Sequence, residues 1–299
     1  MPSGCRSHRA RLRPKPRPRP RLPNAVFSGS THWDCQFPID RRRPVGQTLS
    51  QQLQAGAGVT FLEGLKYVYR ESIAFMIACP LLALIPIVFE LVQHIAEVSI
   101  SMYESPEMAV ATEKHPLRVS FGLLKIAALT LPLYWATRFF AGGRDAAAAR
   151  SFDRRAIKLF AVAFAFMMAV AAISLFLTPS DGLATAAMLI GSLFVQVLIA
   201  RWLAAAAIGN PAIGPLRSAR VMLGQLVWAI PFIVIAQLPL MIPHYGLAGL
   251  AILGPKTLLW PVLIFDSLLV GWLAIVLVAA NWVIATRPGP VKPDGNALP

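Results

Sequence analysis

The chain has 299 residues, of which 56% are hydrophobic and only 14% charged, and its formal net charge is +14. Soluble domains usually carry about 25% charged residues, so this chain has too few polar side chains to cover a surface that faces water. The composition therefore excludes a water-soluble globular enzyme and predicts a protein that is solvated mainly by lipid.

The first 60 residues differ in composition from the rest of the chain. Residues 1–43 contain eleven Lys or Arg and only two acidic residues. Five prolines between Pro14 and Pro23 alternate with basic residues, and proline at this density enforces an extended backbone and forbids a helix. We predict that residues 1–60 form a disordered basic arm. Its expected partners are anionic lipid headgroups at the cytoplasmic face, and not nucleic acid.

The basic arm does not have the features of a targeting segment. No apolar core follows its basic start, which argues against a secretory signal, and its prolines argue against the amphipathic helix of a mitochondrial presequence. An open alternative is that the natural protein starts near residues 45–60, and that the arm is translated upstream sequence.

Residues 61–287 are predicted to form an all-α, polytopic membrane domain, followed by a short flexible tail at 288–299. Residues 61–71 mix apolar with charged side chains, which is typical of an interfacial helix. Six apolar segments then follow, each close to the roughly 20 residues that a helix needs to cross a bilayer. They lie at about 73–93, 119–140, 157–177, 183–203, 221–242 and 258–285.

The distribution of Lys and Arg predicts the orientation of these six spans. Near the span ends, thirteen basic residues fall on the side that carries both termini and four fall on the other side. Basic residues accumulate in cytoplasmic loops. We therefore expect both termini in the cytoplasm and the chain in a bacterial inner membrane.

The segments between the spans carry turn signals and short amphipathic runs. Residues 178–182 predict a tight turn, with Asp181 as a helix cap, so that spans three and four form an antiparallel hairpin. Gly142 and Gly143 are expected to end span two, and residues 144–158 to form a basic cytoplasmic helix. The apolar run 245–254 is too short to cross a bilayer and is expected to be an outer interfacial or re-entrant segment.

Three ionisable residues within the predicted spans are the candidate site: Glu90, Lys125 and Asp266. A charge in the hydrocarbon is costly, at ~2.5 to 3.5 kcal/mol on insertion scales, and it must face protein, water or a partner. The predicted topology places all three side chains in the outer half of the membrane, so an ion pair between Lys125 and Asp266 is allowed, with Glu90 as a third member. The alternative is a structural pair that fixes helix packing, or a Lys125 that reaches the headgroups.

Two spacings resemble metal sites, but we predict no metal and no cofactor. Cys5 and His8, with His32 and Cys35, lie in the arm, where no fold would hold them in place. A second group consists of His94, Glu97 and His115. These residues fall in the predicted first outer loop, where their side chains can approach one another.

The sequence leaves two main functions open. Enzyme motifs such as HExxH, GxSxG and a phosphate-binding loop are absent, so we lean away from an enzyme; a lipid-modifying enzyme that uses outer-loop His and Glu is the least favoured alternative. The favoured hypothesis is a non-enzymatic membrane protein that supports membrane organisation, assembly or a partner complex, which includes a protein partner or a homo-oligomer. The alternative is a permease or channel subunit for a small or amphiphilic solute, with Asp266 in the pathway.

Overall fold

The computed structural model describes residues 60–177 and 182–288, and the regular structure within these ranges is entirely helical. Most of the predicted arm, the tail beyond residue 288 and the proposed cap at Asp181 lie outside the described residues. The helices of the described ranges are α2 (Phe61–Ala78), α3 (Pro80–Ser99), α4 (Pro106–Ala111), α5 (Pro116–Thr130), α6 (Pro132–Ala141), α7 (Ala146–Arg150), α8 (Arg154–Leu177), α9 (Gly182–Ala207), α10 (Pro215–Leu223), α11 (Leu226–Leu253), the 3-10 turn η1 (Lys256–Leu258) and α12 (Leu259–Thr286).

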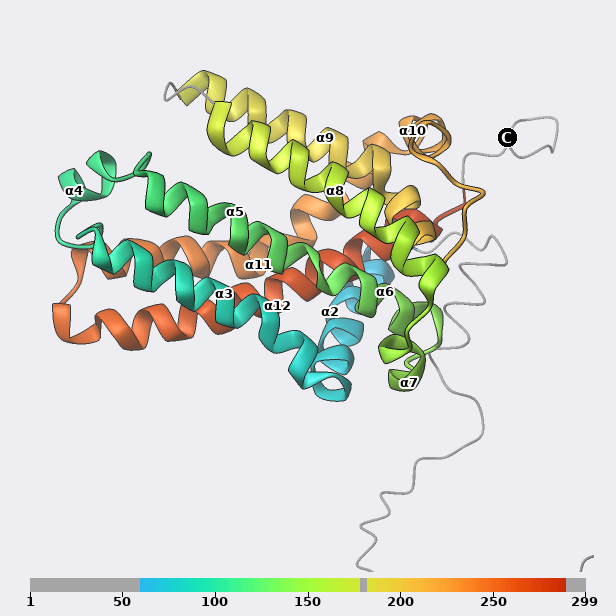
Figure 1. The fold of residues 1–299 in the computed structure, drawn as a ribbon, viewed down its shortest axis with the longest axis horizontal. Helices are drawn as coiled ribbons and strands as arrows, with labels where there is room; N and C mark the ends of the chain where they lie inside the picture. Colours follow the sequence, from blue (N-terminus) through green and yellow to red (C-terminus); the bar gives the residue numbers. More distant parts are fainter. Residues whose placement is uncertain (1–59, 178–181, 289–299) are drawn as a thin grey trace, which may run out of the picture. The chain divides into compact units, whose positions relative to one another are not determined.

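Six helical segments in the described ranges are long and apolar enough to cross a membrane, as predicted. They are Pro80–Ser99, Pro116–Ala141, Arg154–Leu177, Gly182–Ala207, Leu226–Leu253 and Lys256–Thr286. Figure 1 shows that α4, the C-terminal end of α8, the N-terminal end of α9 and the junction between α11 and α12 lie at one end of the bundle. The opposite end carries α7, α10 and the C-terminal end of α12 (Figure 1). We call these the α4 end and the α7 end.

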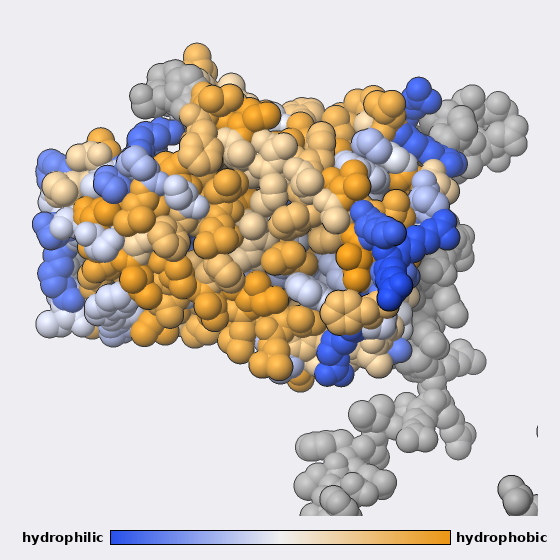
Figure 2. Space-filling model, in the orientation of Figure 1, coloured by the Kyte–Doolittle hydropathy of each residue, from blue (hydrophilic) through white to orange (hydrophobic). Residues whose placement is uncertain are grey.

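A comparison of two equally apolar helices indicates which solvent surrounds the bundle. The most apolar 18-residue stretches of segments 154–177 and 256–286 both have a mean hydropathy of 2.5, but only 11% of the first stretch is buried, against 61% of the second. The α8 surface that remains includes exposed Val162, Phe166 and Phe176. Figure 2 shows hydrophobic side chains over the middle of this face of the bundle and hydrophilic ones towards the helix ends. Exposure of such a wide apolar surface to water is unfavourable, so lipid is its solvent.

The first span starts later than the sequence predicted because the chain breaks at Cys79. Pro80 has no backbone N–H to continue the preceding helix, and α2 ends at Ala78 while α3 begins with Pro80. Residues 73–78 therefore belong to α2, and the first span is Pro80–Ser99 and not 73–93. This shift brings His94 and Glu97 into the helix, whereas the sequence placed them in a loop.

Two other predicted segments also differ from the structure. Residues 245–253 are not a separate re-entrant piece, because α11 continues through Pro231, Pro239 and Pro243 to Leu253. Residues 144–158 do not form one helix either. Asp145 caps the short α7, whose last residue is Arg150, and a second helix begins at Arg154.

Helix α12 occupies the centre of the bundle and packs against α2, α3, α6, α9 and α11. Its buried residues run along nearly its whole length, from Val262 to Ala285. Small residues allow close approach: a Cβ added to Gly271 would lie 2.2 Å from Ile87 Cγ1 of α3. The contact between α12 and α3 sets the position of the polar side chains described next.

Candidate functional site

One face of α3 carries four polar side chains at its α4 end: Glu90, Gln93, His94 and Glu97. The spacing of three and four residues places them on the same side of a helix. All four are at least 94% buried, with relative exposures of 1%, 6%, 6% and 4%. Burial of so many polar groups is costly unless each has a partner, so their contacts indicate what this region does.

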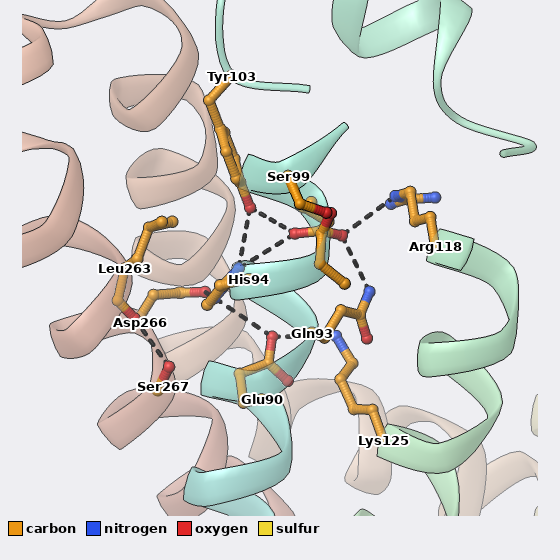
Figure 3. Close-up of polar contacts among 12 residues, drawn as sticks. Glu90, Gln93, His94, Ser99, Tyr103, Arg118, Lys125, Leu263, Asp266 and Ser267 are labelled. Atoms are coloured by element: carbon orange, nitrogen blue, oxygen red, sulfur yellow. Dashed lines mark hydrogen bonds and ion pairs between the residues drawn. The ribbon is translucent and has the colours of Figure 1, made fainter. Parts of the chain in front are cut away.

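His94 connects the carboxylates of α3 to that of α12 (Figure 3). Its Nε2 lies 3.2 Å from Asp266 Oδ2 and 3.6 Å from Glu90 Oε1. Its Nδ1 lies 3.1 Å from Glu97 Oε2 and 2.9 Å from the Tyr103 hydroxyl. A single imidazole ring therefore contacts three carboxylate side chains.

Glu97 is the most completely satisfied of the three carboxylates. It accepts hydrogen bonds from Gln93 Nε2 at 3.0 Å, from Arg118 Nε of α5 at 3.1 Å and from the Tyr103 hydroxyl. Tyr103 lies in the connection between α3 and α4, where burial, followed by the Glu97 charge, raises the pKa of its phenol. The phenol therefore stays protonated and acts as a donor.

The ion pair that the sequence allowed, Lys125 with Asp266, is not the pair that forms. Lys125 Nζ donates to Glu90 Oε1 at 3.0 Å, while Asp266 is held by two imidazoles. The second of these is His244 of α11, whose Nδ1 lies 2.7 Å from Asp266 Oδ1. The sequence placed His94 in a loop and so left it out of this group. On α3, His94 lies next to both Glu90 and Asp266 and takes the place beside Asp266 that the sequence allowed for Lys125.

The three predicted site residues nevertheless lie in one cluster. We define the outer cluster as Glu90, Gln93, His94, Glu97, Tyr103, Arg118, Lys125, His244 and Asp266. It contains three carboxylates and two permanent cations, so its charge is negative unless a histidine is protonated. The cluster lines a cavity of about 170 Å³ that reaches the surface near Tyr245, which is 67% exposed.

Two buried acceptor atoms of the outer cluster have no hydrogen-bond partner among the described residues. These are Glu90 Oε2 and Gln93 Oε1. Both side chains line the cavity. A buried carboxylate oxygen without a donor is unusual in a native fold, and it leaves the site short of one donor or cation at Glu90 Oε2.

Sequence reasoning identified Glu90, Lys125 and Asp266 because charges stand out within apolar segments, but it missed the rest of the cluster. The signal on α3 was present, since Glu90, Gln93, His94 and Glu97 repeat at helical spacing. His244 carried no such signal, because it stands alone next to Pro243. His115, which the sequence grouped with His94, is exposed and instead accepts a hydrogen bond from the Leu117 backbone N–H at 3.2 Å.

Comparison with known proteins adds no relative: no protein-family model, no curated protein and no solved structure matches this chain. The function has to be argued from the outer cluster.

Proposed function

We propose that the chain is a permease or channel subunit for a small solute, with the outer cluster in its pathway. The observation that carries this proposal is the cavity that reaches Asp266. A closed hydrophobic bundle needs no such cavity, and ionisable groups at membrane depth commonly mark ion and substrate pathways. The volume of about 170 Å³ is several times the ~30 Å³ of one water and below the ~300 Å³ typical of drug-sized ligand sites. It suits an ion or a solute of a few atoms.

The proposed setting is a bacterial inner membrane with both termini in the cytoplasm. Arg138, Arg144, Arg150 and Arg154 belong to the α6–α8 region at the α7 end, and basic residues favour the cytoplasmic side. In this orientation the outer cluster lies in the half of the bilayer that faces away from the cytoplasm. The prolines inside α11 support the same proposal, because broken backbone bonding in a span lets a helix bend around a pathway.

Flux into proteoliposomes tests the proposal. Empty and protein-containing vesicles are compared for entry of protons, Na⁺, Zn²⁺, acetate, urea and glycerol, with entrapped dyes for the ions and osmotic swelling for the solutes. We expect entry of at least one probe to be several-fold faster with protein, and Asp266→Asn to abolish most of the gain. Glu104→Gln is the matched control, because Glu104 is an exposed acid at the same end.

Equal entry into empty and protein-containing vesicles for every probe would contradict the permease proposal. So would an Asp266→Asn protein that carries a probe as fast as Glu104→Gln does. Either result would favour the second candidate, a non-enzymatic protein that supports membrane organisation or a partner complex. That candidate draws on the broad apolar surfaces of α8 and α9, where Val162, Leu183 and Leu189 are more than 60% exposed.

A further inference from the structure

We propose that Glu90, His94 and Asp266 form a binding site for a divalent transition-metal ion of the zinc type. The inference deepens the proposed function and rests on it for its meaning, because it names the class of solute that the outer cluster takes. The sequence predicted no metal ligands, since it grouped His94 with residues of a loop. The position of His94 on α3, opposite Asp266, is what brings the ligand set together.

The distances between the ligand atoms fit one ion. Glu90, His94 and Asp266 each offer one oxygen or nitrogen, and these three atoms lie within 4.8 Å of one another. His94 Nε2 lies 3.6 Å from Glu90 Oε1 and 3.2 Å from Asp266 Oδ2. Zinc bonds to nitrogen and oxygen of about 2.0–2.1 Å in tetrahedral geometry place neighbouring ligand atoms roughly 3.3 Å apart. Two of the three separations are already close to this value.

The orphaned Glu90 oxygen is an independent observation that points to a missing cation. Glu90 is 1% exposed, lines the cavity, and has no partner for Oε2 among the described residues. Its other oxygen is held by Lys125. A metal ion next to this carboxylate would supply the positive charge that the unpaired oxygen lacks.

The donor set distinguishes among metals. One imidazole and two carboxylates suit zinc and its neighbours in the first transition row, whereas calcium and magnesium prefer oxygen ligands alone. Three protein ligands leave a fourth position toward the cavity, which is the arrangement of exchangeable sites and not of closed structural ones. His244 then acts from outside the ligand set: its contact with Asp266 Oδ1 at 2.7 Å orients the carboxylate.

Lys125 is the group that competes with a metal for Glu90. Its side chain is 22% exposed, whereas that of Glu90 is 1% exposed. A long lysine side chain can turn its ammonium group towards water or headgroups while its methylenes stay in contact with apolar surface. A divalent ion can therefore replace Lys125 at the Glu90 carboxylate without a rearrangement of α3 or α12.

Metal binding by the purified full-length chain in detergent tests the inference. Zn²⁺ affinity is measured by competition with a chromogenic chelator, and site geometry by the absorption of bound Co²⁺. We expect one ion for each chain, and a loss of affinity of about 100-fold in His94→Ala and Asp266→Asn. His244→Ala should lose about 10-fold, as outer-shell changes do. Two controls should bind like the unmodified chain: His115→Ala, an exposed histidine at the same end, and Cys5→Ser/Cys35→Ser, which removes the sulfur ligands of the arm.

A variant that keeps a ligand guards against loss of folding. His94→Cys replaces the imidazole with a thiolate, and its Co²⁺ complex should gain a thiolate-to-metal charge-transfer band that His115→Cys lacks. Absence of that band in a chain that elutes as folded, or equal Zn²⁺ affinity in all variants, would overturn the metal inference. Zinc binding by a chain that carries no probe into vesicles would keep the site and contradict the permease proposal. Flux of another probe by a chain that binds no Zn²⁺ would keep the permease proposal and contradict the metal site.

Discussion

Glu71 shows what a buried charge requires at the scale of a single residue. It is 2% exposed and accepts two hydrogen bonds of 2.8 Å from Arg144 Nε and Nη2, with a third contact of 3.1 Å from Arg70 Nε. Arg144 adopts a φ of 74°, a left-handed conformation that is unfavourable for a residue with a side chain. The same pairing raises the pKa of the Arg144 guanidinium above its ordinary value. The bidentate ion pair thus holds the chain in place after α6.

Removal of Arg144 should destabilise the fold. Loss of one partner from a buried ion pair costs about 3–5 kcal/mol, and because Arg144 is 39% exposed and Arg70 remains, we expect ~2 kcal/mol for Arg144→Ala. Thermal unfolding in detergent, read by circular dichroism, measures the change, with exposed Arg220→Ala as control. The double variant Glu71→Gln/Arg144→Ala should be more stable than Arg144→Ala alone. A double variant that is less stable would contradict the pairing.

Three charged members of the outer cluster could be predicted from the sequence, but their partners could not. Glu90, Lys125 and Asp266 stand out because each charge interrupts an apolar run. Which of them pair depends on the rotation of α3 against α12, and a single histidine in the correct register changes the answer. His244 lies on a third helix, and no local pattern connects it with Asp266, which is twenty-two residues away along the chain.

At the scale of helices, the contact between α3 and α12 depends on Gly271. A Cβ at this position would lie 2.2 Å from Ile87 Cγ1, closer than packed atoms allow. Gly271→Ala should therefore force the helices apart and destabilise the protein by roughly 1–3 kcal/mol, as over-packed cores do. The measurement is the unfolding temperature of the purified protein, together with its Zn²⁺ affinity, since the same contact positions Glu90 and His94 against Asp266.

Gly191 provides the matched control for this substitution. It also lies inside a helix, but a Cβ added there meets nothing within 4 Å. Alanine is a better helix former than glycine, so Gly191→Ala should leave stability unchanged or raise it. A Gly271→Ala protein as stable as Gly191→Ala would show that α3 and α12 do not approach as described, whereas Gly271→Ala/Ile87→Ala should restore part of the loss.

Hydropathy predicts which helices exist more accurately than where they end. The six spans were predicted because an apolar run of about 20 residues has few other structures available to it. Two of the boundaries that were wrong involve proline. Pro80 starts a helix and displaces the first span, whereas Pro239 and Pro243 lie inside α11 without ending it. Proline therefore ends a helix in one place and not in another, and the packing of the neighbouring helices decides which.

At the scale of the whole described bundle, an apolar surface and a polar cavity occur in one structure. Apolar surface covers the helices, while nine polar side chains meet around a cavity near one end. We propose that the basic residues of the α7 end face the cytoplasm, which would place that cavity on the other side of the membrane. The six spans could be predicted from composition alone, and the orientation that charge predicts stays a proposal. The cavity depends on how four helices meet and has no counterpart in any one segment.

Sidedness of the cavity is the most direct test of the central claim, that a lipid-solvated bundle holds the outer cluster in contact with the non-cytoplasmic side. Ala248 lines the cavity, and Ala248→Cys in a chain without its three native cysteines provides one thiol there for an impermeant maleimide. We expect labelling of intact spheroplasts from outside and protection by Zn²⁺. A matched Ala212→Cys at the α7 end should not be labelled until the membrane is opened. Labelling of Ala248→Cys only after the membrane is opened would contradict the central claim. So would a chain that stays in the supernatant of cell extracts without detergent.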